Sequence, residues 1–231
     1  MSTPAQIITV LAAVAIATAA TWRVLRRRMD PRHLTTLLAA AHAARRDRLT
    51  GSGSRFAFHE AMAAATGQHR RVAVILVNLD GSRPFAGRFG DRALDQLLVL
   101  IAGRMHHLVA AAGGSSFLLR RDELAAIVDG PVTDATGLAA QLLAAVAEPT
   151  EINLNGHPLT VTASACAGVS ALTMSSSGDV RLALVWSDTA MRSAKQAGRG
   201  QVAVFEPTSP RRRTALAQPA PVNDAEGGVT R

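Results

Sequence analysis

Tyrosine is absent from this chain of 231 residues, and aromatic residues make up only 3% of it. Hydrophobic residues of all kinds reach 48%, so a core is expected, built mainly from alanine, leucine and valine. Cysteine occurs once, at Cys166, which excludes an internal disulfide; its apolar neighbours predict a small buried residue. No repeat with a period of about 20 to 50 residues is present, which favours one domain with appendages.

The positive charge is concentrated near one end of the chain. The formal net charge is +8, and residues 23–48 carry +6 of it, from eight arginines against two aspartates. Residues 49–205 carry only +1, without basic residues interleaved with aromatic ones. Nucleic acid is therefore not expected as a partner, because its binding needs a basic surface on the domain itself.

Residues 4–22 form an uncharged, largely apolar run of 19 residues. A bilayer core of about 30 Å needs about 20 such residues in a helix. Arginines follow the run and none precede it, which is the opposite of the order in a cleaved signal peptide. This order predicts a transmembrane anchor over residues 1–23, with the N-terminus outside and the following domain in the cytoplasm. A cleaved signal peptide and a buried core helix are the alternatives.

The segments on either side of the expected domain have different compositions. Residues 24–46 begin with an arginine cluster at 23–28 and continue at helical period, which predicts a juxtamembrane linker helix. The arginine cluster is expected to contact anionic lipid headgroups, so membrane lipids are an expected partner. Residues 207–231 are rich in proline and alanine without periodicity, which predicts a disordered tail.

Between them, residues 47–206 alternate helical and strand patterns. This order predicts an α/β domain with a mixed sheet flanked by helices. The patterns predict helices over 55–67, 92–112, 133–149 and 177–198, strands over 71–77, 158–172 and 201–205, and a hairpin over 117–128.

Four separated segments of this domain resemble the GGDEF, or diguanylate cyclase, family. They are DRLTGSGSR at 47–55, NLDGSRPFAGRFGDRALD at 78–95, RRDEL at 120–124 and SDTAMRSAKQAGRGQV at 187–202. The resemblance implies the palm-like sheet of nucleotidyl cyclases. It also implies a reaction that joins two GTP molecules into cyclic di-GMP, with two domains facing each other in a dimer.

The signature turn of that family is altered here. It consists of Arg120, Arg121, Asp122, Glu123 and Leu124, with arginines where the family has two glycines. Those glycines allow the nucleotide to approach the backbone, so two arginine side chains are expected to crowd it. The alternative is that the arginines add affinity for phosphate.

The resemblance also assigns the metal-binding positions. One falls on Asn78 and the other on Asp122, and the neighbouring Glu123 matches the catalytic position. Mg²⁺ prefers carboxylate oxygens, so binding of Mg²⁺ is expected to be weak with an amide at Asn78, and Glu123 is expected to be vestigial.

The nucleotide-binding positions are kept in part. Asp95 matches a guanine-reading carboxylate, while Ala86 stands where the family has a second guanine contact. Lys195 and Arg199 match the family's phosphate-binding pair, and Lys195 is the only lysine in the chain. A cation at the end of a helix, complementing the helix dipole, is the alternative for Lys195. Asp91, on the same helix as Asp95, is expected to lie on a solvated face.

These substitutions lead us to expect a membrane-anchored, degenerate GGDEF protein that does not synthesise cyclic di-GMP. It would bind GTP or pair with itself or another GGDEF protein through the family's dimer surface. The alternatives are a weakly active diguanylate cyclase and a structural relic for which nucleotide is irrelevant.

Overall fold

The computed structural model describes residues 16–23 and 31–205. The chain divides into two units at residues 44 and 45. In the first unit, residues 16–23 are helical and α2 spans Pro31–Ala44. No described helix is both long enough and apolar enough to cross a bilayer. Most of the expected anchor and all of the expected tail 207–231 lie outside the described residues.

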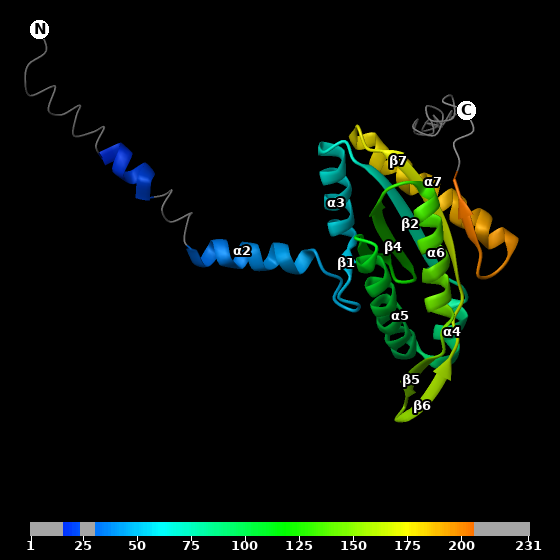
Figure 1. Cartoon of the computed structure of the whole chain (residues 1–231). Helices are drawn as coiled ribbons and strands as arrows, with labels where there is room; N and C mark the ends of the chain where they lie inside the picture. The colour runs from blue at the N-terminus through cyan, green and yellow to red at the C-terminus, as the bar shows by residue number, and fades with distance from the viewer. Residues whose placement is uncertain (1–15, 24–30, 206–231) are drawn as a thin grey trace, which may run out of the picture. The chain divides into compact units, whose positions relative to one another are not determined.

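The second unit alternates helices and strands (Figure 1). Its helices are α3 (Arg55–Gly67), α4 (Ser82–Phe89), α5 (Asp91–Ala111), α6 (Val132–Ala147) and α7 (Ser177–Ala197). Its strands are β1 (Gly53–Ser54), β2 (Arg71–Leu79), β3 (Ser115–Arg120), β4 (Glu123–Asp129), β5 (Thr150–Leu154), β6 (His157–Val161), β7 (Ala165–Thr173) and β8 (Val202–Val204). The expected α/β architecture with a mixed sheet is confirmed.

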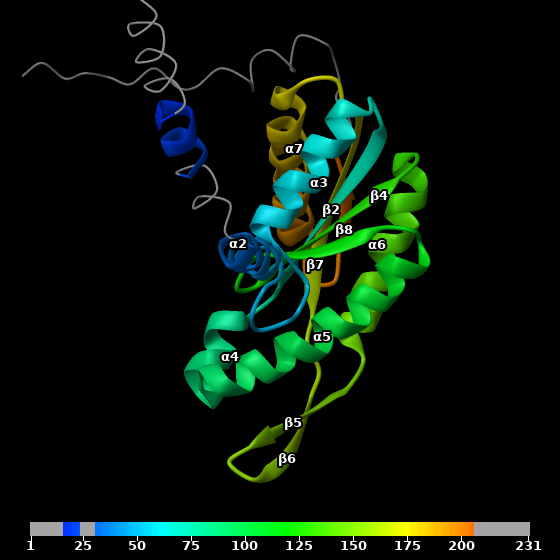
Figure 2. The ribbon, with the colours of Figure 1, turned by 90° about the vertical axis from the view of Figure 1, so that its left-hand side faces the viewer.

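Six strands form one sheet in the order β1-β3-β4-β2-β7-β8, while β5 and β6 form a separate hairpin. The central strand β2 is antiparallel to both of its neighbours, and the two edge pairs, β1 with β3 and β7 with β8, are parallel. Figure 2 shows β2 between β4 and β7, with the β5–β6 hairpin extending away from the sheet.

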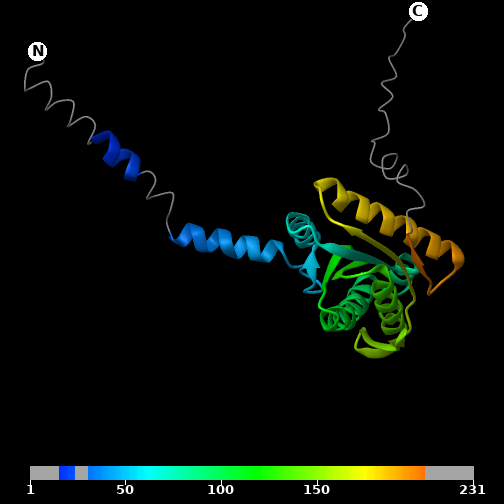
Figure 3. The ribbon, with the colours of Figure 1, turned by 45° about the horizontal axis from the view of Figure 1, so that its top comes forward.

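Both faces of the sheet are covered by helices. Alternate β2 residues pack in two separate cores, since Ile75 belongs to the core beneath α5 and α6 and Val74 to the core beneath α3 and α7. Figure 3 shows α7 and the α5–α6 pair on opposite sides of the sheet. Burial on both faces explains why β2 reads as a continuous apolar run rather than an alternating one.

The strand expected over 158–172 is wrong in its extent. The structure breaks it into β6 and β7, and β6 pairs with β5, a strand that the sequence did not predict. The helix expected over 133–149 also ends earlier, at Ala147. Glu148 has the extended backbone (ψ 136°) that is favoured before a proline such as Pro149.

The helix α4 was not predicted because it is short and contains Pro84. Proline is tolerated there, since the first N–H groups of a helix have no acceptor within it. Gly81 precedes the helix with φ 71°, a left-handed conformation that favours glycine. Thus the chain turns directly from the end of β2 into α4.

The start of α7 is fixed by Asp179. Its carboxylate accepts hydrogen bonds from the backbone N–H groups of Ser175 and Ser176, both at 2.8 Å. Partial burial alone would raise the pKa of Asp179, but hydrogen bonds from both serines outweigh it and lower that pKa. The residue that caps the helix is Ser176, just before its first residue.

Candidate functional site

The candidate site lies where β2 ends beside the β3–β4 turn. Antiparallel pairing places Asn78 opposite Glu123 on one side and opposite Cys166 on the other. The N–H of Leu79 donates to the carbonyl of Asp122 at 3.1 Å, which ties the turn to the end of β2. Residues that are far apart in sequence are therefore held together by the register of three strands.

Arg121 reaches from the turn to α5. Its guanidinium lies 2.8 Å from a carboxylate oxygen of Asp91 and 3.1 Å from one of Asp95. The hydrogen bond to Asp95 is the largest cause of a raised pKa of Arg121, and the pairing with Asp91 adds to it. Asp91 is exposed, as expected of a solvated face, but it is also paired. The carboxylate expected to read guanine is therefore already engaged by the protein's own cation.

Arg120 points to a different partner. Its guanidinium lies 3.7 Å from the carboxylate of Glu123, and its own side chain is 72% exposed. The two arginines of the signature turn thus have separate roles. Arg121 pairs with α5, and Arg120 pairs within the hairpin itself.

The metal positions are also engaged within the chain. The ammonium of Lys195 donates to Oδ1 of Asn78 at 2.6 Å, and the hydroxyl of Ser82 donates to Oδ2 of Asp122 at 2.7 Å. Among the described residues, no group of three or more His, Cys, Asp or Glu side chains is placed to hold a metal ion. A cation already touches the amide at the first position, so these residues do not fit Mg²⁺.

Lys195 and Arg199 are both exposed but lie on different elements. Lys195 is in the last turn of α7, and Arg199 follows in the turn between Gly198 and Gly200. The position of Lys195 also suits a cation that complements the helix dipole. Its contact with Asn78 shows that its ammonium reaches the end of β2, whichever role it serves.

Two adjoining cavities flank the signature turn. One, of about 420 Å³, is lined by polar groups that include Asn78, Asp122, Glu123 and Lys195. The other, of about 400 Å³, lies between α4, α5 and the turn, and is lined by Ala86, Asp91 and Arg121 among others. Arg120 lines both cavities. The expected nucleotide-site residues therefore gather around one region, except that Arg199 and Asp95 line neither cavity.

Residues 44–201 match the family model described as "Diguanylate cyclase, GGDEF domain". The chain belongs to the GGDEF family. The match covers more than half of the chain and includes the whole sheet up to the start of β8. No curated protein sequence matches the chain.

Solved GGDEF structures share this fold. The GGDEF domain of YfiN from Pseudomonas aeruginosa is 25% identical, with a TM-score of 0.60, over 73% of this chain and 99% of that one. The FimX GGDEF domain from the same organism is 23% identical, with a TM-score of 0.58, over 68% of this chain and 98% of that one. The GGDEF domain of DgcB from Caulobacter crescentus, solved with c-di-GMP, is 19% identical, with a TM-score of 0.63, over 71% and 97% of the two chains.

The first motif of this GGDEF domain has a structural function. The carboxylate of Asp47 accepts hydrogen bonds from the N–H groups of Leu49 and Thr50 and from the Thr50 hydroxyl, at 2.8 to 3.1 Å. Arg45, just before it, forms a two-point ion pair with Glu60 on α3 at 2.7 and 2.9 Å. Together they hold the loop that leads into the domain.

Two contacts at the site escaped the sequence analysis. Ser82 holds Asp122, and Asp91 shares Arg121 with Asp95. A polar first turn after Gly81 was the only available signal for Ser82. The pairing of Asp91 could not be read from the sequence, because it depends on where the arginine of the turn reaches.

The carboxylate of Glu123 is buried, with the residue only 8% exposed. Burial raises its pKa, and this effect outweighs the opposing attraction of Arg120. A carboxylate with a raised pKa is suited to accept a proton. Here, however, the ionised carboxylate of Glu123 also destabilises the folded domain at neutral pH.

Glu123→Gln is therefore expected to stabilise the GGDEF domain at neutral pH by on the order of 1 kcal/mol, the typical cost of a poorly compensated buried group. The raised pKa means that the folded state holds its proton to higher pH than the unfolded state does. The advantage of the variant should be absent at acidic pH, where both states are protonated. It should grow as the pH rises through the pKa of the folded state.

Thermal denaturation of both proteins from acidic to neutral pH measures the effect, with Glu151→Gln, at an exposed position of β5, as the matched control. An equal stability difference at every pH would mean that ionisation of Glu123 is not the cause.

Proposed function

We propose that this chain is a membrane-anchored, non-catalytic GGDEF domain that acts as a protein-interaction module in cyclic di-GMP-type signalling and binds GTP only weakly. The observation that carries the proposal is the pair of internal contacts at the site. Arg121 engages Asp95, and Lys195 engages Asn78. Guanine recognition and metal binding would each have to displace a cation that belongs to the protein.

The internal contacts of the site disfavour GTP binding but do not prevent it. Side chains in the Arg121 ion pairs are 38% to 72% exposed, and water weakens ion pairs that are this exposed. A ligand could break them, but it would then need its own binding energy to compensate. With Ala86 in place of a guanine contact and Asn78 in place of a metal ligand, little such energy is available.

The anchor and the location are part of the proposal. The uncharged run 4–22 followed by arginines supports one transmembrane segment, with the N-terminus outside and the GGDEF domain in the cytoplasm. The arginine cluster at 23–28 would then contact anionic lipids.

The proposed partner is a second GGDEF domain, either another copy of this chain or a different family member. Membership of the family supports this, because the family reaction joins two nucleotides held by facing domains. SiaD from Pseudomonas aeruginosa, which has this fold at 18% identity and a TM-score of 0.62, was solved in complex with its activator SiaC.

A weak diguanylate cyclase is the second candidate. It is favoured by one observation, namely that Asp122, Glu123 and Lys195 line the same cavity. Such a cyclase would need Lys195 to leave Asn78 and a metal ion to bind through Asp122. The contacts that engage both residues within the chain oppose this.

Titration of the full-length chain with GTP tests the proposal. We expect a Kd of about 1 mM or weaker, with Lys195→Ala weakening it further by about fivefold, since the Lys195 ammonium lines the polar cavity and would pair with a phosphate. Arg181→Ala, an exposed cation near the other end of α7, is the matched control and should leave the Kd unchanged. A Kd in the micromolar range would contradict the closed site.

A further inference from the structure

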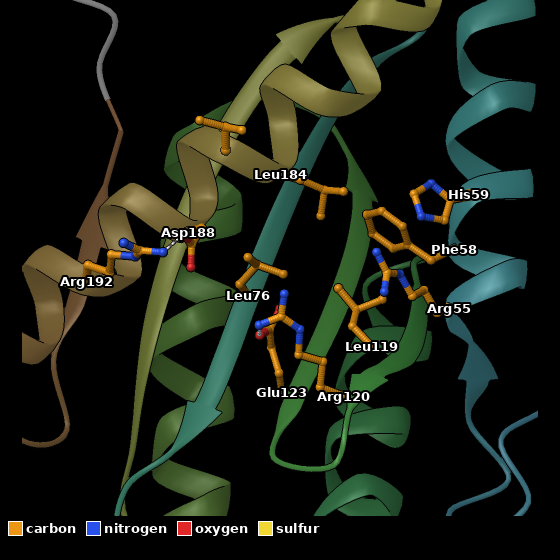
Figure 4. A pocket seen from close by; sticks show the side chains of 11 residues that line it. Arg55, Phe58, His59, Leu76, Leu119, Arg120, Glu123, Leu184, Asp188 and Arg192 are labelled. Atoms are coloured by element: carbon orange, nitrogen blue, oxygen red, sulfur yellow. Dashed lines mark ion pairs between the residues drawn. The ribbon is translucent and has the colours of Figure 1, made fainter. Parts of the chain in front are cut away.

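A separate cavity of about 210 Å³ lies between α3 and α7, on the other face of the sheet from α5 and α6 (Figure 4). Its walls come from elements that are distant in sequence. Arg55, Phe58 and His59 come from α3, Leu184, Val185, Asp188 and Arg192 from α7, and Leu76, Leu119, Arg120 and Glu123 from the sheet and its turn.

The bottom of this α3–α7 cavity is apolar and rigid. Phe58 is 0% exposed and Leu76 is 2% exposed, and Phe58 packs edge-on against Phe117 with ring centroids 5.4 Å apart. Leu119 and Leu184 line the same cavity in Figure 4 and are only half-buried, so they supply the apolar surface that a ligand can contact. A preformed apolar floor favours a ligand with a ring or a short hydrocarbon group.

The rim carries three arginines against two carboxylates. Arg192 pairs with Asp188 at 2.8 Å, and Arg120 pairs with Glu123 at 3.7 Å. Within the part of the chain that the structure describes, the guanidinium of Arg55 forms neither an ion pair nor a side-chain hydrogen bond. The charge of Arg55 also attracts the Glu123 carboxylate, but three arginines against two carboxylates leave a net positive charge for a ligand.

We propose that the α3–α7 cavity binds a small amphipathic monoanion, with its apolar group on Leu119 and Leu184 and its carboxylate on Arg55. Guanidinium is suited to two-point recognition of a carboxylate, which a neutral isostere cannot reproduce. The size of the cavity limits the ligand to about one six-membered ring with its acid group. The inference does not depend on whether the domain binds GTP.

A ligand in the α3–α7 cavity would change the contacts of the signature turn. Arg120 and Glu123 line both the α3–α7 cavity and the cavity that contains Asn78 and Lys195. A bound anion would attract Arg120 away from Glu123 and repel the Glu123 carboxylate. The ligand site and the signature turn therefore share two charged side chains without sharing a cavity.

Benzoate is a suitable probe, with benzamide as its uncharged isostere. We expect benzoate to bind the full-length chain with a Kd of about 1 mM, the affinity that a ligand of this size commonly reaches. Benzamide should bind about tenfold more weakly. In two-dimensional amide NMR spectra, the benzoate-dependent shifts should centre on Arg55, Leu76 and Leu184.

Two variants test the assignment of the roles. Arg55→Gln should weaken benzoate about tenfold and leave benzamide unchanged. Leu184→Phe fills the floor and should remove binding of both compounds. Arg83→Gln, on α4 beside the other cavities, is the control and should change neither.

Equal binding of the two compounds, or benzoate affinity that survives Arg55→Gln, would overturn the role of Arg55. Absence of saturable binding, or shifts centred elsewhere, would overturn the site itself.

Discussion

Arg121→Gly is expected to raise the affinity of the GGDEF domain for GTP by about tenfold. The arginine lies 2.8 Å from Asp91 and 3.1 Å from Asp95, so its removal frees Asp95, the carboxylate expected to read guanine. It also removes a side chain from the cavity beside α4 and α5. Loss of two exposed ion pairs together with relief of crowding is expected to account for a factor of about ten.

Isothermal titration with GTP measures this change, and two matched variants separate its causes. Arg121→Lys keeps a cation at the position and should bind GTP as weakly as the parent. Arg120→Gly supplies a turn glycine without freeing Asp95 and should have a smaller effect. If Arg121→Gly binds no better than the parent, the ion pairs with α5 are not what keeps GTP out.

Gly168→Ala is expected to destabilise the domain by about 3 kcal/mol or more, the largest effect of any substitution considered. A Cβ atom at Gly168 would lie 2.1 Å from the carbonyl oxygen of Ser187 and 2.3 Å from the backbone nitrogen of Met191. Both atoms belong to the backbone of α7, which cannot move without leaving the sheet. This close approach is also what brings Lys195, at the end of α7, within reach of Asn78.

Denaturant unfolding measures this loss, and Gly137→Ala is its matched control. Gly137 lies within α6, and a Cβ added there meets nothing within 4 Å. Alanine should therefore stabilise that helix by about 0.5 to 1 kcal/mol. A Gly168→Ala protein as stable as the parent would show that α7 does not rest on β7 as closely as described.

The main elements of the fold could be predicted because their patterns are strong. The apolar run of β2 and the long amphipathic pattern of α5 are found close to the predicted positions. The errors fall where local signals were weak. The helix α4 was missed because it contains Pro84, and proline usually argues against a helix. The boundary between β6 and β7 was missed because the residues on both sides of it read as one strand.

Motif spacing singled out Asn78, Asp122, Glu123 and Lys195 as site residues, which stays a prediction. The strand register pairs Asn78 with Glu123, and single hydrogen bonds link Asp122 and Lys195 to the end of β2. The spacing could not show that Lys195 touches Asn78, or that Arg121 spans to Asp95. These contacts depend on side-chain reach between a turn and two helices, which a linear pattern does not encode. They are nevertheless the contacts that argue most directly against catalysis.

The most direct test of the central claim is to look for the product. Full-length chain is incubated at high concentration with GTP and either Mg²⁺ or Mn²⁺, beside a Glu123→Ala control, and cyclic di-GMP is measured by mass spectrometry. Our account predicts no cyclic di-GMP above the level of the control with either ion. Product that forms with the parent chain and disappears with Glu123→Ala would contradict it, and would mean that Lys195 leaves Asn78 and a working metal site forms.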